Sequence, residues 1–391
     1  MTAHHPTSVT ELAAIVAEAH ARQSPLAVAG GGTRAGLCRP VQAAASVSTA
    51  GLTGITLYEP AELVIAARAG TPLREVTETL AARNQRLPFE PMDHRGLYGT
   101  TGEPTVGGIA AGNVSGPARI NLGAARDSMI GLKFVNGRGE DIKSGGRVMK
   151  NVTGLDLVKT LAGSHGTLGI FHEVCFKVLP RAETEATLQL TGLGDAEAIE
   201  ALSAALGSPF EPTGAAHLPA RVGESARTLI RIEGFAASTS YRSAALARLL
   251  ARFGTLDRLP EAEAAALWPA IRDLGLLDGA EAMIWRLSVP PSKAAAIGER
   301  LKAEGARLIY DWGGGLISAA LGADATAAPR IHALARSAGG HATLIRADEA
   351  IRRSVDVFAP PAPGLMAMQK KLKSSLDPAG ILNPGRMYPG V

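Results

Sequence analysis

Cysteine, aromatic residues and net charge are all scarce in this sequence. Two of its 391 residues are cysteine, Cys38 and Cys175, and 4% are aromatic. Two thiols are too few to ligate an iron–sulfur cluster, and their spacing forms no metal pair. Forty basic and 36 acidic residues leave a formal charge of +4, which is too little over this length to indicate a nucleic-acid-binding protein. We therefore expect neither a metal site nor a nucleic-acid partner.

Long apolar runs are also missing. No stretch approaches the ~18 uncharged apolar residues of a membrane span, and the start of the chain lacks the pattern of a secretory signal. Since 46% of the residues are hydrophobic and 19% are charged, the chain is expected to fold around buried cores, in two or three domains. We expect a cytoplasmic protein with no direct membrane span.

Glycine, in contrast, is abundant. The chain has 45 glycines, and 17 of them lie between Gly96 and Gly169, where average usage is about 7%. The stretch has no fixed period and contains apolar runs typical of strands, which excludes collagen and low-complexity linkers. The remaining reason for such density is close backbone approach or positive φ at many positions. We interpret the stretch as backbone that lies along a long ligand.

The first part of the chain predicts alternating helices and strands. Its first six or seven residues look loose, and Ser8 with Glu11 forms a capping-box pattern that begins a helix ending near Arg22. A second helix is expected over 73–84. The chain between 148 and 163 reads as a loop and a helix. Strands are predicted at 26–29, 47–48, 54–58, 63–68, 129–136 and 169–179.

The composition changes at Pro180-Arg181, and a second series of elements follows. Strands are predicted at 186–193, 228–235, 283–289, 308–317 and 342–345, and helices at 196–206, 242–253, 261–274, 293–305 and 329–339. This alternation of strands and helices predicts an α+β domain with helices on one face of a sheet. A last helix is expected over 364–376, where we interpret Lys370, Lys371 and Lys373 as a solvated helix end.

Three glycine-rich segments are candidates for ligand contact. The first, Gly30-Gly31-Gly32-Thr33-Arg34, lacks both the Gly-Lys-Ser/Thr ending of a triphosphate loop and the G-x-G-x-x-G spacing of a dinucleotide fold. Its successive N–H groups can form a nest for one anion, although a plain turn explains it nearly as well. The second segment runs from Pro104 to Gly116 and the third from Ala162 to Ile170. Three such segments in one domain are harder to explain by packing alone.

Taken in this order, the three segments resemble the PCMH-type FAD-binding domain of the vanillyl-alcohol-oxidase-like flavoproteins. Asp377-Pro378-Ala379-Gly380-Ile381-Leu382-Asn383-Pro384-Gly385-Arg386 resembles the tail of the FAD-linked oxidases related to glycolate and D-lactate dehydrogenases. A narrower resemblance, to the E-subunit family of bacterial glycolate oxidases, rests on residues 58–64, 146–157, 285–290, 311–314 and 339–343.

This resemblance implies an α+β fold in three parts. A two-subdomain FAD-binding domain is expected over 1–181, a smaller ferredoxin-like α+β cap domain over 182–373, and a tail that returns to the FAD domain over 374–391. FAD is expected to be non-covalent, because neither His nor Cys directly follows the first glycines; His94 is the one remaining candidate for a covalent link. The implied FAD contacts are Gly30, Gly31, Gly32, Thr33, Arg34, Thr105, Val106, Gly107, Gly108, Asn113, Gly116, Thr167, Gly169, Ile170 and Asn383.

The catalytic residues are less clearly indicated. Larger catalytic subunits of this family carry a His-x-Gly-Asp-Gly-Asn-x-His segment, whereas the comparable region here reads Gly339-Gly340-His341-Ala342-Thr343. Arg286 and His341 are the candidates for binding and activating substrate. Arg346, Asp311 and Trp312 are further polar or aromatic groups, and we expect Asp311 to cap a turn. Trp285 is expected to face the core while Arg286, its neighbour on the strand, faces a cleft or solvent.

Three functions remain open from the sequence. The resemblance favours a FAD-binding subunit of a glycolate oxidase complex, together with a larger catalytic flavin subunit and an iron–sulfur subunit. Such a subunit would take part in passing electrons from glycolate, and its partners would hold it peripherally at the inner membrane. The alternatives are a self-sufficient FAD-dependent dehydrogenase of glycolate or D-lactate, and a scaffold subunit without redox function.

Overall fold

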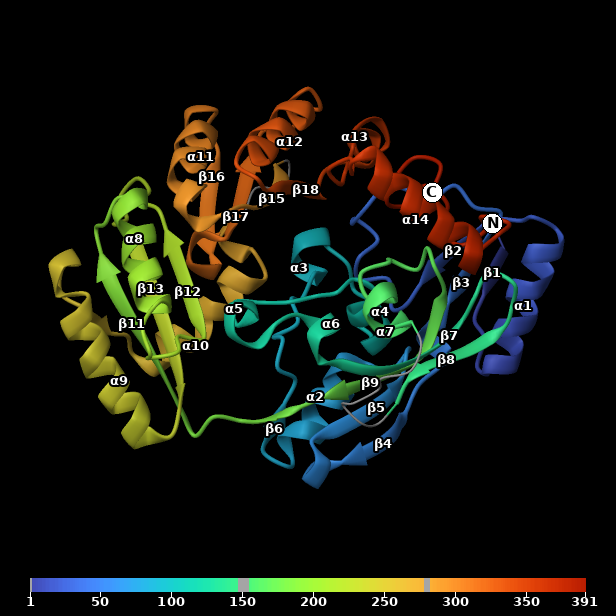
Figure 1. Ribbon diagram of the computed structural model, residues 1–391, viewed down its shortest axis with the longest axis horizontal. Coiled ribbons are helices and arrows are strands. Elements are labelled where there is room, and N and C mark those ends of the chain that lie inside the picture. Colours follow the sequence, from blue (N-terminus) through green and yellow to red (C-terminus); the bar gives the residue numbers. More distant parts are fainter. Residues whose placement is uncertain (1, 147–154, 278–281) are drawn as a thin grey trace. The chain divides into compact units, whose positions relative to one another are not determined.

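The computed structural model describes residues 2–146, 155–277 and 282–391, and these form two compact units (Figure 1). The first unit comprises the described parts of 1–115, 123–181 and 360–391, and the second comprises 116–122 and the described parts of 182–359. Most of the glycolate-oxidase-like motif at 146–157 lies outside the described residues. Within the described chain, no helix combines the length and the apolar character needed to cross a membrane.

The first unit contains a small parallel sheet and a larger antiparallel sheet. The parallel sheet has the order β1-β3-β2, and the antiparallel sheet the order β4-β5-β9-β7-β8. The strands are β1 Thr2–His4, β2 Leu26–Ala29, β3 Ala45–Ser48, β4 Ile55–Glu59, β5 Val64–Arg68, β6 Gln85–Arg86, β7 Met129–Val135, β8 Asp141–Gly145, β9 Ile170–Lys177 and β10 Leu179–Pro180. The helices are α1 Val9–Ala21, α2 Leu73–Ala81, α3 Arg95–Tyr98, α4 Val106–Ala111, α6 Ala125–Ser128, α7 Leu157–Leu161 and α14 Pro363–Leu376.

The start of the chain is ordered, which differs from the prediction. Thr2–His4 forms β1 and pairs in parallel with β3 from Ala45 to Val47. The prediction of loose residues was wrong because three residues carry no periodic signal, and their order comes from a strand far along the sequence. The predicted N-cap of α1 is confirmed, since Ser8 Oγ accepts a hydrogen bond from the Glu11 N–H at 3.2 Å.

The apolar face of α1 packs where the two sheets of this unit meet. Leu12 and Val16 are fully buried together with Val47 of β3, Val135 of β7 and Ile170 of β9. Ile381 and Leu382 of the C-terminal tail complete the same core. The tail is therefore part of the hydrophobic core of the first unit.

Lys373 anchors the tail, and this role is not predicted by the sequence. Its side chain is 7% exposed, and Nζ donates to the carbonyl oxygens of Thr167 and Leu382 and to Asp377 Oδ2 at 2.7, 2.8 and 2.7 Å. The interpretation of Lys373 as a solvated helix end was therefore wrong, although Lys370 and Lys371 on the same helix are exposed. The contacts of Lys373 also explain why the chain from Pro360 belongs to the first unit, before the expected start of the tail at 374.

The second unit is built on one eight-stranded antiparallel sheet, in the order β14-β11-β13-β12-β16-β17-β15-β18. The strands are β11 Thr184–Thr191, β12 Gly214–Leu218, β13 Arg227–Gly234, β14 Asp257–Arg258, β15 Met283–Ser288, β16 Arg307–Asp311, β17 Leu316–Leu321 and β18 His341–Arg346. The helices are α5 Arg119–Leu122, α8 Asp195–Leu206, α9 Ala236–Leu249, α10 Glu261–Arg272, α11 Pro291–Ala303, α12 Ala327–Ser337 and α13 Glu349–Ser354. The element order βαββαβ occurs twice, each time in the ferredoxin-like arrangement, and the two halves join between β12 and β16.

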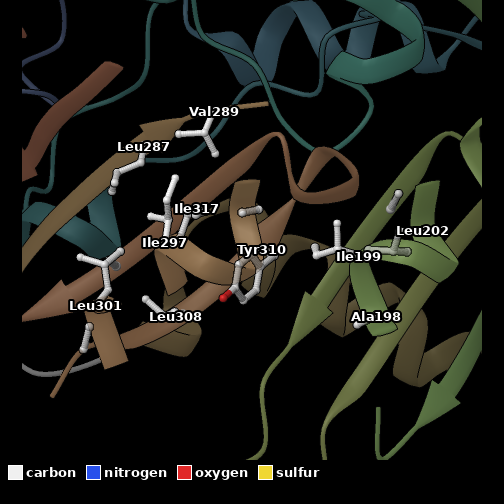
Figure 2. Close-up of a cluster of buried hydrophobic side chains, with 14 of the residues drawn as sticks. Ala198, Ile199, Leu202, Leu287, Val289, Ile297, Leu301, Leu308, Tyr310 and Ile317 are labelled. Atoms are coloured by element: carbon white, nitrogen blue, oxygen red, sulfur yellow. The ribbon is translucent and has the colours of Figure 1, made fainter. Parts of the chain in front are cut away.

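The core of this unit lies on one face of the sheet, under α8, α9, α11 and α12. The prediction of helices on one face does not hold for α10, whose Trp268 donates to Thr187 Oγ1 and contributes nothing to this core. Figure 2 shows Tyr310 of β16 among side chains from α8, such as Ile199, and from α11, such as Ile297. The Tyr310 hydroxyl donates to Asp195 Oδ2 at 2.5 Å, and Lys302 Nζ lies 2.7 Å from the same oxygen. Tyr310 thus joins the two βαββαβ halves by packing and by a partly buried hydrogen bond.

Two strand predictions in this unit were wrong. β12 was not predicted, because Gly-Ala-Ala-His-Leu has little β-propensity, and its strand is instead fixed by pairing with β13 and β16. The single strand expected over 308–317 is two strands, separated by a turn in which Trp312 and Gly313 adopt positive φ of 55° and 65°.

The buried lysine gives a first testable prediction. Replacing Lys373 by Met leaves the Asp377 carboxylate, which is 1% exposed, without its cation, so we expect K373M to lose about 3–5 kcal/mol of unfolding free energy. K371M on the exposed face of the same helix is the matched control and should stay within about 0.5 kcal/mol of wild type. Urea denaturation of the three proteins measures this difference, and equal midpoints for K373M and K371M would contradict the structural role of Lys373.

Candidate functional site

A cavity of about 310 Å³ opens in the first unit between segments that are far apart in the sequence. It is lined by the loop after β2, by the start and end of α4, and by the turn that leads into β9. One residue of the C-terminal tail, Arg386, completes the lining. The three glycine-rich segments found in the sequence therefore meet at one place.

The first loop is packed against backbone. A Cβ atom placed on Gly31 would lie 1.8 Å from the carbonyl oxygen of Glu103, and one on Gly102 would lie 1.8 Å from the carbonyl oxygen of Gly31. A Cβ on Gly30 would lie 2.4 Å from Thr105 Oγ1. Contacts under 3.0 Å cannot be accommodated when the neighbour is backbone, so these glycines are required to bring the two segments together.

The second segment forms a short helix that the sequence did not predict. Thr105 caps α4, and its Oγ1 accepts a hydrogen bond from the Gly108 N–H at 3.3 Å. A Cβ atom on Gly112 would lie 2.0 Å from Arg34 Nη1, and one on Gly108 would lie 3.2 Å from Arg34 Nη2. The guanidinium of Arg34 therefore lies on the glycine side of α4, where no side chain intervenes.

The cavity is electrostatically positive. Burial lowers the pKa of Arg34 to about 10, so the side chain stays charged at neutral pH. Burial, and after it the charges of Arg386 and Arg34, lower the pKa of His165 to about 3, so His165 is neutral. Among the described residues that line the cavity there is neither Asp nor Glu. Two guanidiniums beside glycine-rich backbone suit the phosphate groups of a ligand.

Most of the expected cofactor residues line this cavity, and some lie elsewhere. Those in the lining are Gly30, Gly31, Gly32, Thr33, Arg34, Thr105, Gly107, Gly108, Gly169 and Ile170. Val106 is a core residue, 2% exposed, and Asn113 Oδ1 accepts from the Arg126 N–H at 2.9 Å. Thr167 Oγ1 donates to the Ser164 carbonyl at 2.7 Å. Gly116 belongs to the second unit, where its carbonyl accepts from Trp312 Nε1 at 3.2 Å.

The side chain of Asn383 connects two segments of the cavity wall. It is fully buried, and its Oδ1 accepts from the Val28 N–H at 2.7 Å while its Nδ2 donates to the carbonyl oxygens of Val28 and His165 at 3.3 and 2.8 Å. These contacts use its side-chain amide on the protein itself, so Asn383 positions β2 and the His165 turn. The sequence singled out Asn383. The lining residues Gly112 and His165 lie inside the second and third predicted segments, and Arg386 closes the tail motif, but none of the three was named as a contact.

A second polar group gathers in the second unit around Trp312. The guanidiniums of Arg119 and Arg286 lie over its ring at 4.9 and 5.4 Å from the centroid. Burial, followed by the charges of Arg286 and Arg119, lowers the pKa of His341. Both catalytic candidates, Arg286 and His341, thus belong to one cationic cluster, and Arg119 is a member that the sequence analysis missed.

The remaining candidates have structural contacts. Asp311 Oδ1 accepts from the Trp312 N–H at 2.7 Å, which confirms the predicted cap, and Arg346 Nε donates to the Ala282 carbonyl at 3.2 Å. Trp285 is fully buried in the core, as predicted. His94 is 8% exposed, its Nδ1 lies 3.1 Å from the Met92 carbonyl, and it is absent from the cavity lining. No group of three or more potential metal ligands exists among the residues that could be searched.

Comparison with protein families finds two matches in this chain. A model described as FAD binding domain matches residues 3–145, and one described as FAD linked oxidases, C-terminal domain, matches residues 361–387. The first match contains the loop after β2 and α4, and the second contains Lys373, Asn383 and Arg386. The two matches therefore cover most of the segments that form the cavity in the first unit.

Among curated proteins, similarity extends over nearly the whole chain. It is 33% identical over 374 residues to glycolate oxidase subunit GlcE of Escherichia coli, covering 95% of each chain. It is 26% identical over 423 residues to an uncharacterized FAD-linked oxidoreductase of Mycobacterium tuberculosis, covering 98% of this chain and 90% of that protein. A D-2-hydroxyglutarate dehydrogenase of Xanthomonas citri is 33% identical over 189 residues, which are 48% of this chain and 36% of that protein.

Solved structures show the same fold at low sequence identity. p-Cresol methylhydroxylase with bound substrate aligns with a TM-score of 0.74 at 14% identity, covering 99% of this chain and 88% of that chain. Alkyldihydroxyacetonephosphate synthase aligns with a TM-score of 0.72 at 16% identity, covering 98% and 75%. The expected fold class, an α+β chain with a PCMH-type FAD-binding domain, is confirmed.

The neutral state of His165 predicts how stability depends on pH. Unfolded, the residue binds a proton near its usual pKa of about 6.5, whereas in the folded protein it stays neutral down to about pH 3. The unfolded state therefore binds more protons between these values, and stability falls as the pH decreases. For the ligand-free protein we expect His165 to contribute a loss of about 2 kcal/mol between pH 7 and pH 5.

The variant His165→Asn isolates this contribution, because Asn tolerates the positive φ of 51° at this position. Urea unfolding at several pH values should give H165N a shallower pH dependence than wild type. The exposed His5 supplies the control variant H5N, whose pH dependence should match that of wild type. An unchanged slope in H165N would show that His165 is not held neutral.

Proposed function

The chain belongs to the FAD-linked oxidase family that includes glycolate oxidase subunit GlcE, and from this membership we propose that it is the FAD-binding subunit of a glycolate-oxidising complex. The observation that carries the proposal is the cavity of the first unit, where three glycine-rich segments and two arginines surround one space. The match to a FAD binding domain spans residues 3–145, which include the first two of these segments, and this supports the proposal. The similarity to GlcE covers the second unit as well, so the proposal applies to the whole described chain.

The residues of the cavity fit the diphosphate of FAD. The loop of Gly30, Gly31 and Gly32 presents bare backbone, Thr33 adds a hydroxyl, and Arg34 adds a charge. Gly107 and Gly108 of α4 also line the cavity, and Gly169 and Ile170 line it next to β9. FAD, when bound, supplies a two-electron acceptor for oxidising a hydroxy acid.

The reaction assigned to the complex converts glycolate to glyoxylate with the loss of two electrons and two protons. This chain has two cysteines, at positions 38 and 175, which cannot bind an iron–sulfur cluster. Electrons that reach the flavin therefore leave to another chain. We assign that role to an iron–sulfur subunit, and the main oxidation of glycolate to a larger catalytic flavin subunit like glycolate oxidase subunit GlcD, which is the name of a Bacillus subtilis relative 42% identical over 84 residues.

A second candidate function is direct oxidation of a 2-hydroxy acid by this chain. The cluster of Arg119, Arg286 and His341 around Trp312 favours it, because a guanidinium can bind a carboxylate and a neutral imidazole can accept the hydroxyl proton. Turnover of glycolate or D-lactate with a dye as acceptor, by the isolated FAD-loaded chain, would establish this function. Turnover only after addition of the partner subunits would reject it.

FAD binding itself is tested with two glycine variants. The wild-type chain should take up FAD and show the flavin absorbance band, and Gly31→Ala should lower its FAD affinity at least about tenfold, because the new Cβ would lie 1.8 Å from the Glu103 carbonyl oxygen. Gly96→Ala is the matched control in the same unit, since nothing lies within 4 Å of its Cβ position. A wild-type chain that stays colourless after reconstitution with FAD would overturn the proposed function.

A further inference from the structure

Arg386 reaches the cavity from a tail whose backbone is fixed on both sides. The Arg386 N–H donates to the Asn383 carbonyl at 3.2 Å, and the Arg386 carbonyl accepts from the Arg39 N–H at 3.0 Å. Gly385 before it has a φ of 71°, which turns the chain toward the cavity at a position that favours glycine. Asn383 in turn is fully buried and bound to β2 and the His165 turn. The backbone position of Arg386 is therefore set by the same tail that holds the cavity walls.

The Arg386 side chain carries an unsatisfied donor. Its Nε is buried and has no hydrogen-bond partner in the described structure. A buried donor without a partner costs free energy, and the positive charge raises that cost. The lining offers Arg386 no carboxylate and places Arg34 in the same cavity. Two guanidiniums of the same charge therefore face one space, an arrangement that a bound anion of two charges would stabilise.

Resting on the proposed function, we propose that Arg386 is a diphosphate-binding residue, which works with Arg34 to bind the two phosphate groups of FAD from opposite segments of the chain. Arg34 is held on the glycine side of α4, and Arg386 is held by the tail. A diphosphate provides two phosphate groups, so each guanidinium can bind its own group, whereas a monophosphate provides one group for both. The tail is then a selectivity element, which favours ligands with a diphosphate over those with a single phosphate.

The experiment measures binding to the ligand-free, full-length chain. FAD affinity is measured by flavin fluorescence, and ADP and AMP are titrated as competitors of FAD. We expect Arg386→Gln to weaken FAD and ADP at least about tenfold and to change AMP by less than about threefold. Arg386→Lys keeps a charge without the planar fork and should lie between the two. The dependence of ADP affinity on salt should become weaker in R386Q, since one charge contact is lost.

Arg138 supplies the matched control. It is exposed, and its Nη1 donates to the Ser375 carbonyl of the tail at 3.1 Å outside the cavity. R138Q should bind FAD, ADP and AMP as wild type does. Urea unfolding of every variant shows whether the fold is kept, and R386K provides the reading if R386Q unfolds.

The outcomes separate this inference from the function on which it rests. R386Q that binds ADP as tightly as wild type overturns the inference, and so does an equal loss for ADP and AMP, because Arg386 would then act on the nucleoside side or on the cavity walls. If R386Q unfolds, the inference is supported when R386K loses ADP affinity and keeps AMP affinity, and overturned when R386K binds both as wild type does. A wild-type chain that binds no FAD rejects the proposed function, which is a different result.

Discussion

The side-chain amide of Asn383 joins the segments on which the cavity depends. It binds both backbone groups of Val28 in β2 and the carbonyl oxygen of His165, so the loop after β2 and the turn before β9 are held at a fixed separation. Asn383 is placed by the tail, which pairs Leu382 with Leu26 and is itself anchored by Lys373 and Asp377. Lys373 also donates to the Thr167 carbonyl, so two residues of the tail, Lys373 and Asn383, bind the turn that contains His165. Residues at the end of the chain thus organise a site that begins at residue 27.

Glycine density was the strongest feature of the sequence, and the structure shows that it has two causes. Gly31 and Gly102 allow two backbone segments to touch, and Gly137 makes room for Asp377, whose Oδ1 would lie 2.3 Å from a Cβ there. Gly108 and Gly112 instead leave room for the Arg34 guanidinium at the wall of the cavity. The interpretation as backbone along one long ligand is therefore only part of the explanation. Sequence alone cannot separate the causes, since both require a missing side chain, and only the neighbours in space tell them apart.

The elements that the sequence predicted well are those with their own periodic signal. α1, α8, α11 and α14 repeat their apolar residues at helical spacing, or begin with a proline at the first turn, and local chemistry was enough to place them. β1, β12 and the break between β16 and β17 depend on partners elsewhere in the chain. His165 and Arg386 stood inside the third glycine-rich segment and the tail motif, but neither was named as a contact. The sequence does not show which side chains of a segment line the cavity, and this depends on how the tail folds back.

A cavity with two guanidiniums and no carboxylate in its described lining is costly for the protein to keep without a ligand. Burial lowers the pKa of Arg34, and burial followed by the charges of Arg386 and Arg34 lowers that of His165, so a positive charge is disfavoured at both groups. The walls are fixed by contacts that bear no charge: the backbone packing at Gly31 and the side-chain hydrogen bonds of Thr105 and Asn383. An anion that enters finds its counter-charges already in place and need not reorganise them. The glycine loops and the buried C-terminal tail therefore act together. Their packing holds Arg34 and Arg386 so that both positive charges line the cavity.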